Sequence, residues 1–380
     1  MDATVTEGKA KIMISGSSKI SRKMPVFYNP AMKLDRDVSV LLLKSVKNKR
    51  LRIADPLAAS GIRSIRFLLE LDKSKVKEVV INDSSSSAVA NIKSNLRLNK
   101  LGKNKKIKVA NEEASVFLLK NRPFDYIDID PFGSPVYFLD SAIKSLSRDG
   151  ILAVTATDTA ALAGTAPKAC LRKYWSVPLK NYLMHELGLR ILIRRAQLAA
   201  ASNGKALIPV YSYSKLHYMR VFFRCGNKIT DVNKILKQHN FVSYCGTCLS
   251  AEILSTKNIC SNCKNKKVVI AGPMWSGNLF DSGLAASIYK NDSSSGDNFL
   301  KTISEESKIK TLGFYDTHIF SKRFKIRVPK LEAVITVLRE NGFMAARTHF
   351  SGNGIRSGIG NKEFVRLLRR IRQSTEKSEI

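Results

Sequence analysis

The chain is poor in cysteine and in long apolar runs, and both shortages narrow the class of protein. Its 380 residues contain six cysteines, which are too few for a disulfide scaffold at this length. No apolar run approaches the roughly eighteen residues that a transmembrane helix needs. Residues 1–16 lack the basic and then apolar pattern of a secretory signal. We therefore expect a cytoplasmic globular protein with two or three domains.

Acidic residues are scarce relative to basic ones. The chain has 64 Lys and Arg against 31 Asp and Glu, a formal charge of +33. This surplus favours a polyanionic partner, because each neutralised phosphate releases counterions. An acidic membrane surface and a lysine-rich genomic bias are the alternative explanations. The basic residues extend along the whole chain, which favours an extended nucleic-acid-binding surface over a basic tail.

From residue 51 onward, short apolar runs alternate with helical stretches. We expect strands at 51–55, 79–83, 107–110, 124–130 and 150–155, with helices between them at 62–71, 85–98, 113–120 and 136–147. A helix over 177–201 and a hairpin of 206–213 with 218–224 should follow. Strands separated by helices pair in parallel through right-handed crossovers. This α/β order is that of the class I, Rossmann-like methyltransferase sheet.

The pattern changes after Gly226, where paired cysteines, a Gly/Pro/Trp loop and a serine-rich stretch appear. We therefore predict one domain over 1–228 and a second, smaller α/β domain over 229–380.

The segment DYIDIDPFG at 125–133 is the most informative local pattern. A strand carries acids to its carboxyl end, where ligands bind in a doubly wound sheet. The Asp130 carboxylate and the Pro131 carbonyl can accept the two hydrogens of an exocyclic amine, while the Phe132 ring stacks on the base. The competing interpretation is a strand that simply ends at proline and glycine.

Acids also follow two other predicted strands. Asp83 stands where nucleotide ligands have their ribose hydroxyls bound. Glu113 and the amide of Ala114 can hold an adenine amine. Between the first strand and its helix, Gly61 lets the backbone approach a ligand. Helix capping is the alternative role for both acids, but three acids at successive strand ends together favour a nucleoside-bearing cofactor.

Four cysteines form a CxxC-x11-CxxC pattern. This spacing is typical of a closed, structural zinc site, and iron is the alternative metal. We expect the two other cysteines, Cys170 and Cys225, to be packed thiols. The predicted ligands are Cys245, Cys248, Cys260 and Cys263.

Two residues before the sheet are further candidates. Arg36 can pair bidentately with a cofactor carboxylate, and a surface arginine is the alternative. Phe27 can sandwich a base against Phe132, and core packing is the alternative. The loops at 272–277 and 347–351 contain polar, aromatic and basic residues that suit nucleotide contact.

Taken together, these motifs resemble those of the archaeal and eukaryotic tRNA guanine-N2 dimethyltransferases, which act on guanosine 26. The similar strings lie in the same order over nearly the whole chain. They are EGKA at 7–10, VFYNP at 26–30, ASGIR at 59–63, DIDPFG at 128–133, TDTA at 157–160, KACLRKY at 168–174, GPMW at 272–275 and RTHFS at 347–351.

The resemblance implies a methyltransferase domain that binds S-adenosyl-L-methionine and a zinc-containing C-terminal domain that binds tRNA. It implies that Asp130 is the catalytic acid and that Phe27, Pro131 and Phe132 lie beside the guanine. The residues that it places around the cofactor are Arg36, Arg63, Asp83, Glu113 and Ala114. Glu113 stands where the family has Asp, and Asp35 stands where it has Asn.

We therefore expect a monomer that methylates N2 of guanine 26 in tRNA. One alternative is an amino-methyltransferase for adenine N6 in DNA or rRNA, but the corner of such enzymes has a second proline before the aromatic residue. The other is a non-catalytic zinc protein that binds nucleic acid. That alternative leaves the acids Asp83, Glu113 and Asp130 at the strand ends unexplained.

Overall fold

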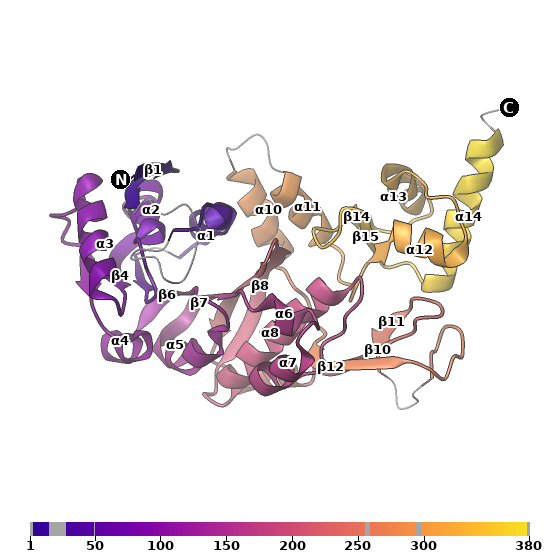
Figure 1. Cartoon of the computed structure of the whole chain (residues 1–380), viewed down its shortest axis with the longest axis horizontal. Helices are drawn as coiled ribbons and strands as arrows, with labels where there is room; N and C mark the ends of the chain where they lie inside the picture. Colours follow the sequence, from indigo (N-terminus) through magenta and orange to yellow (C-terminus); the bar gives the residue numbers. More distant parts are fainter. Residues whose placement is uncertain (1–2, 15–27, 49, 255–258, 293–297, 378–380) are drawn as a thin grey trace.

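The computed structural model describes residues 3–14, 28–48, 50–254, 259–292 and 298–377, with the side chains of the last helix described up to Ile371. Phe27, predicted to contact the base, lies outside the described residues. Figure 1 shows the N-terminal and C-terminal parts of the chain at opposite ends of the long axis, with the main sheet nearer the N-terminal end.

Seven strands form the central sheet, and its first five strands run parallel. β9 is antiparallel to both β7 and β8. The order confirms the predicted class I methyltransferase sheet, including the hairpin at its edge. Across the sheet it is β5 (Ile107–Ala110), β4 (Val76–Asn82), β3 (Leu51–Asp55), β6 (Phe124–Ile129), β7 (Leu146–Ala156), β9 (Tyr218–Gly226) and β8 (Ala206–Lys215).

Helices cover both faces of this sheet, which explains why its central strands are almost continuously apolar. One apolar core joins the sheet to α4 (Ala114–Asn121), α5 (Leu139–Ser145) and α8 (Met184–Ala201). The other joins it to α1 (Lys33–Ser45), α2 (Ile62–Glu70) and α3 (Ser86–Leu98). An N-terminal hairpin of β1 (Ala3–Glu7) and β2 (Ala10–Ile14) packs on α2 and α3.

Two helix predictions were too long. The helix expected over 177–201 begins only at Met184, because Val177 pairs with Gly272 in an isolated bridge. The helix expected over 136–147 begins as the 3-10 turn η2 (Pro135–Phe138) and ends at Ser145, since residue 146 already belongs to β7. The short helices α6 (Thr159–Leu162) and α7 (Pro167–Tyr174) were not predicted.

After the hairpin, the chain first returns to the cores of the main sheet. A three-stranded sheet packs on α8 through β12, and α10 packs against α1. The predicted boundary at 228 therefore stays a prediction, because residues on both sides of it share these cores. The elements are α9 (Ile229–Leu236), β10 (His239–Tyr244), β11 (Ala251–Ile253), β12 (Val269–Trp275), α10 (Ser282–Lys290) and α11 (Asn298–Glu306).

A third apolar core lies in the C-terminal part of the chain. It is built from the small sheet β13-β15-β14 and three helices. These elements are β13 (Tyr315–Asp316), α12 (Thr317–Phe324), α13 (Leu331–Glu340), β14 (Ala345–Arg347), β15 (Gly354–Ser357) and α14 (Asn361–Lys377). Within the described ranges, no helix combines the length and apolar character that crossing a membrane requires.

Candidate active site

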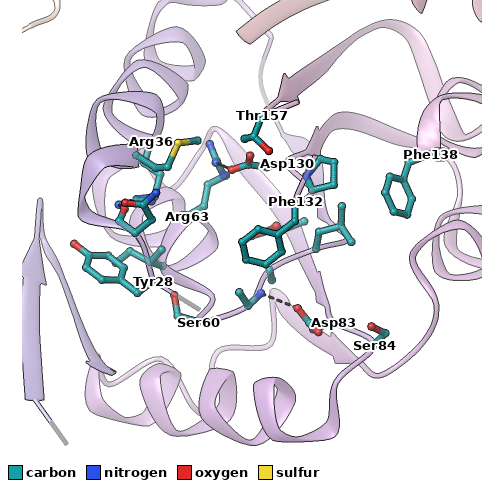
Figure 2. A pocket seen from close by; sticks show the side chains of 18 of the residues that line it. Tyr28, Arg36, Ser60, Arg63, Asp83, Ser84, Asp130, Phe132, Phe138 and Thr157 are labelled. Carbon is teal, nitrogen blue, oxygen red and sulfur yellow. Dashed lines mark hydrogen bonds and ion pairs between the residues drawn. The ribbon is translucent and has the colours of Figure 1, made fainter. Parts of the chain in front are cut away.

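A cavity of about 730 Å³ opens at the carboxyl edge of the central sheet. Figure 2 shows side chains from α1, α2 and the loops after β3, β4 and β6 around it. The structure thus brings together six predicted residues in its lining, namely Arg36, Arg63, Asp83, Asp130, Pro131 and Phe132. The predicted Glu113 and Ala114 are not among its lining residues.

The corner after β6 is held in shape by Thr157. The Gly133 amide donates to Thr157 Oγ1 over 2.6 Å, and the Thr157 amide donates to the Gly133 carbonyl over 2.9 Å. Gly133 has φ +88°, a conformation that glycine adopts without strain. The ring of Phe132 is consequently presented at the cavity with 47% of its surface exposed.

Residues of two further motifs support this corner from behind. Ser134 Oγ donates to the Tyr174 hydroxyl over 3.0 Å, and that hydroxyl donates to Asp158 Oδ1 over 2.6 Å. Lys173 also pairs with Asp158, at 3.0 Å. The strings at 157–160 and 168–174 therefore shape the site. The sequence analysis singled out both strings without assigning a role to Thr157 or Asp158.

Beneath the cavity, four carboxyl groups surround two guanidinium groups. Arg63 pairs with Asp130, with Asp35 at 2.7 Å and with Asp128 at 3.3 Å. Arg220 makes two bonds to Asp128, at 2.8 and 2.7 Å, and its Nε lies 3.2 Å from Asp35. The remaining member, Asp55, is buried and accepts from Ser64 Oγ over 2.7 Å. We call Asp35, Asp55, Asp128, Asp130, Arg63 and Arg220 the acid cluster.

The acid cluster holds more carboxyl groups than its arginines can neutralise. Burial raises the pKa of Asp55 to about 7; Arg63 opposes this rise, and Asp128 and Asp130 add to it. Burial likewise raises the pKa of Asp130 despite Arg63. For Asp128, Arg220 and Arg63 outweigh burial and lower the pKa. A bound cation would relieve the surplus of negative charge.

Arg36 is buried rather than on the surface, so the surface alternative was wrong. Its Nε and Nη2 bond Glu7 at 2.7 and 2.6 Å, and Nη2 also donates to the Asn29 carbonyl over 3.0 Å. Glu7 accepts from Arg66 as well, at 2.9 Å. Burial raises the pKa of Glu7, but Arg36 and Arg66 prevail and lower it to about 2. These bonds tie the N-terminal hairpin to the cavity wall.

The loop after β3 forms another wall, and polar residues of β4 and the loop after it set its shape. Gly61 caps α2 at φ +74°, where a Cβ would stand 3.2 Å from Ile92. Asp83 accepts from the amide of Ala59 over 2.8 Å (Figure 2). Asn82, which the sequence analysis missed, donates to the carbonyls of Pro56 and Glu112, both at 3.0 Å.

The two predicted adenine contacts lie at the start of α4. Glu113 accepts from the amides of Ser115 and Val116, at 2.8 and 3.0 Å. Its alternative role as a helix-start acid is therefore confirmed. Ala114 is buried in the first turn of the same helix. Contact of either residue with an adenine stays a prediction.

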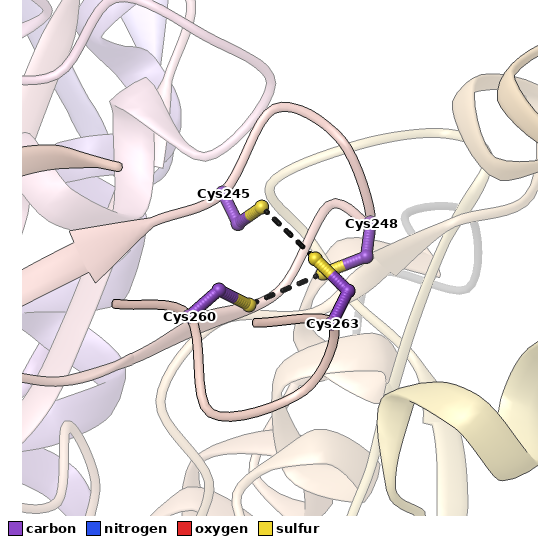
Figure 3. Close-up of side chains that lie close together, drawn as sticks. All are labelled: Cys245, Cys248, Cys260 and Cys263. Carbon is purple, nitrogen blue, oxygen red and sulfur yellow. Dashed lines mark hydrogen bonds between the residues drawn. The ribbon is translucent and has the colours of Figure 1, made fainter. Parts of the chain in front are cut away.

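The four predicted metal ligands converge (Figure 3), with all four sulfur atoms within 4.8 Å of one another. Cys245 and Cys263 lie 3.6 Å apart, and Cys248 and Cys260 lie 3.5 Å apart. Tetrahedral zinc with ~2.3 Å bonds places its sulfur ligands ~3.8 Å apart, so the site fits zinc. The other two cysteines, Cys170 and Cys225, are buried as predicted.

The cysteine knuckles contact the C-terminal helices. Arg323 Nε of α12 donates to the Thr247 carbonyl over 2.6 Å, and Asn262 bonds Asn361 of α14 at 3.3 Å. Leu249 belongs to the third apolar core. A metal here therefore has a structural role, since it stabilises loops that hold the C-terminal part.

Comparison with known proteins agrees with this geometry. The family model described as "N2,N2-dimethylguanosine tRNA methyltransferase" matches residues 8–369. A tRNA (guanine(26)-N(2)/guanine(27)-N(2))-dimethyltransferase of Aquifex aeolicus is 38% identical, covering 97% of this chain and 96% of the relative. A tRNA (guanine(26)-N(2))-dimethyltransferase of Methanothermobacter thermautotrophicus is also 38% identical, covering 96% of this chain and 98% of the relative.

Among solved structures, Trm1 from Pyrococcus horikoshii in complex with S-adenosyl-L-methionine is similar over nearly its whole length. It has a TM-score of 0.84 and 36% sequence identity, covering 96% of this chain and 99% of that one.

Proposed function

The chain belongs to the N2,N2-dimethylguanosine tRNA methyltransferase family, and we propose that its reaction takes place at the corner of Asp130, Pro131 and Phe132. The enzyme uses S-adenosyl-L-methionine to methylate the exocyclic N2 of guanine 26 in tRNA, giving N2-methylguanosine and N2,N2-dimethylguanosine. The observation that carries the proposed site is the cavity that this corner shares with the acid cluster.

The cavity residues fit this cofactor. When bound, S-adenosyl-L-methionine supplies an electrophilic methyl group on a positively charged sulfur. The unneutralised carboxylates of the acid cluster suit that charge. Asp83, which follows β4 and lines the cavity, would bind the ribose hydroxyls. We further propose that Arg36 and Arg63 line the methionine end, and that Glu113 and Ala114 bind the adenine.

The corner residues would hold and activate the guanine. The lone pair of N2 is delocalised into the ring, so the free amine is a poor nucleophile. Hydrogen bonds from its two N–H groups to Asp130 and to the Pro131 carbonyl would localise the lone pair and direct it at the methyl carbon. Phe132 would stack on the ring, with Phe27 proposed for the opposite face. Orientation of this kind supplies much of the rate enhancement.

Asp130 is suited to accept the proton that N2 loses as the new N–C bond forms. Burial raises its pKa, so it binds a proton more readily than an ordinary aspartate. Arg63 keeps the carboxylate oriented through their ion pair. With 24% of its side chain exposed, Asp130 can pass the proton to water. After one transfer, N2 retains one N–H for Asp130, which permits a second methylation once the cofactor is exchanged.

We further propose that the two parts of the chain have different roles. We assign methyl transfer to residues 1–228 and part of the tRNA binding to residues 229–380. In that second part, the loops of the zinc site contact α12 and α14, which are rich in basic residues. The charge of +33 supports contact with tRNA over a wide surface. We propose that the enzyme acts as a monomer in the cytoplasm.

Nucleoside mass spectrometry tests the function directly. An unmodified tRNA transcript is incubated with the purified protein and S-adenosyl-L-methionine, next to a transcript with adenine at position 26. Dimethylguanosine should form only in the first. Methylation of a base other than guanine, or of both transcripts equally, would contradict the proposed substrate.

A further inference from the structure

The tip of the β8–β9 hairpin has an unusual side chain for its conformation. The two strands pair as far as Lys215 and Tyr218, which leaves Leu216 and His217 as the tip. Leu216 has φ +49°, a region that costs a non-glycine residue about 1–2 kcal/mol. Its side chain is also 65% exposed. The tight turn of a two-residue hairpin requires this positive φ, but glycine adopts it without strain. A leucine there strains the backbone and exposes an apolar side chain that adds nothing to the core, which points to a role in function.

This tip lies at the mouth of the catalytic cavity. His217 lines the same cavity as Asp130 and Phe132. Met219 of β9 pairs with Ala156, the last residue of β7, so the tip extends just beyond the strand end from which Thr157 holds the catalytic corner. Leu216 is thus an exposed apolar residue beside the lining of this cavity.

Hydrogen bonds and one cation–π contact hold the base of the hairpin in place. Near the sheet, the Tyr213 hydroxyl donates to Asp35 over 3.1 Å, and Arg220 is bonded to Asp128. From the C-terminal part, His349 Nε2 accepts from the Ser214 amide over 3.3 Å. The Lys215 ammonium lies 4.6 Å from the ring centroid of Phe299. Both sides of the hairpin base are therefore fixed, while the tip itself faces outward.

We propose that Leu216 is the wedge that keeps the target guanine out of the tRNA stack. This inference rests on the proposed function, since a base inside a helical stack cannot place N2 at the Asp130 corner. Extruding a base costs on the order of a few kcal/mol, and apolar side chains inserted at the disrupted step offset such a cost. Leu216 fills the space that the guanine leaves, and His217 borders the path of the nucleotide into the cavity.

The test uses a tRNA transcript with fluorescent 2-aminopurine at position 26 and no cofactor. Wild-type protein should raise the fluorescence severalfold, because the extruded base is no longer quenched by stacking. Leu216→Ala should lose at least two thirds of that rise while its affinity for the tRNA stays within about twofold. Leu119→Ala, an exposed leucine on α4, is the matched control and should behave as wild type.

Methylation of two tRNA substrates adds a second readout. On the ordinary transcript, Leu216→Ala should reduce kcat/KM at least tenfold. On a transcript whose base opposite guanine 26 has been removed, the reduction should shrink to less than threefold, because that guanine is already loosely held. Leu216→Gly, which relieves the positive φ, should show the same pattern and be no less stable than wild type.

If Leu216→Ala and Leu216→Gly lower kcat/KM equally on both transcripts, Leu216 does not act as a wedge. The same conclusion follows if Leu216→Ala retains the full rise in fluorescence. No fluorescence rise with wild-type protein would overturn base extrusion altogether. Failure of the proposed function would look different, since wild-type protein would then not methylate the ordinary transcript at position 26.

Discussion

Two buried charge clusters in this molecule use the same residue types for different ends. The acid cluster beneath the cavity sets four carboxyl groups against Arg63 and Arg220. A second cluster, which we call the junction cluster, joins α8 to α11 and β15 with two carboxyl groups, two guanidinium groups and His349. Its members are Glu186, Arg190, Glu306, His349 and Arg356.

The ionisation of the carboxyl groups differs accordingly. In the junction cluster, Arg356 and Arg190 outweigh burial and lower the pKa of Glu186 to about 2. The pKa of Glu306 is lowered too, against burial, mainly by His349 and Arg356. In the acid cluster, by contrast, burial raises the pKa of Asp55 to about 7 and also raises that of Asp130.

The space beside each cluster differs as well. The cavity lined by Arg190 and Arg356 measures about 30 Å³, whereas the acid cluster faces a cavity of about 730 Å³. A balanced, closed cluster can only hold parts of the fold together. A cluster with unneutralised carboxyl groups beside an open cavity destabilises the folded protein, but its negative charge favours the binding of a cationic ligand.

The largest effect is expected at Asp130. Asp130→Asn should lower methyl transfer to N2 by about 1,000-fold, because the amide cannot accept the proton. The unfolding free energy should change by less than about 1 kcal/mol, because the cluster has carboxylates to spare. Single-turnover methylation and urea unfolding measure the two quantities. Activity within tenfold of wild type would show that Asp130 is not the acceptor.

Glu186→Gln should have the opposite effect: it should lower stability and leave methyl transfer nearly unchanged. It leaves Arg190 without a carboxylate partner and Arg356 with Glu306 alone, so we expect a loss of about 3 kcal/mol in unfolding free energy at pH 7. Single-turnover methylation by the folded protein should stay within threefold of wild type. The exposed Glu340→Gln is the matched control.

The effect of Glu186→Gln should also depend on pH. The folded-state pKa of Glu186 is lowered, so its stabilisation is present above about pH 4.5 and is lost as the pH falls toward 2. The difference between variant and wild type should therefore narrow at pH 3. A constant difference from pH 3 to pH 7 would contradict the assigned ion pairs.

Asp55→Asn should stabilise the protein at high pH. The folded-state pKa of Asp55 is raised, so the cost of ionising it grows from its unfolded value of 3.8 up to about pH 7 and is constant above that. We expect the variant to gain on the order of 4 kcal/mol at pH 8 and nothing at pH 4. Urea unfolding without cofactor measures this. A gain equal at both pH values would mean that the carboxyl charge is not its cause.

The smallest effect is expected at an exposed ion pair. Lys144 and Asp140 on α5 lie 2.7 Å apart, but both side chains are largely exposed to solvent. Lys144→Ala should change the unfolding free energy by no more than about 0.5 kcal/mol. A loss as large as that of Glu186→Gln would show that burial is not what makes the ion pairs of the junction cluster stabilising.

Several site residues were predictable because the fold class brings strand ends together. Once parallel strands with helical crossovers were recognised, Asp83 and Asp130 had to lie at one edge of the sheet, and both line the cavity. The cysteine spacing likewise predicted that four sulfurs would meet. In each case a short local pattern carries the information.

The members of the acid cluster were much less predictable. Arg220 lies on β9 and Asp35 on α1, and no local pattern indicates that they meet. The bonds between Glu7 and Arg36 were missed for the same reason. Leu216 gave no signal either, because neither the positive φ of a hairpin tip nor the cavity beside it can be read from residue types.

The amino-acid sequence by itself therefore determined the succession of strands in the central sheet, the corner at Asp130 and the four-cysteine site. Local periodicity and spacing encode these features, since each depends on residues close together in the chain. Only the tertiary structure decided which buried charges are neighbours, which arginines are already paired and which loops face the cavity. The reason is physical: ionisation and burial depend on every group within a few ångströms, and packing brings those groups from distant parts of the chain.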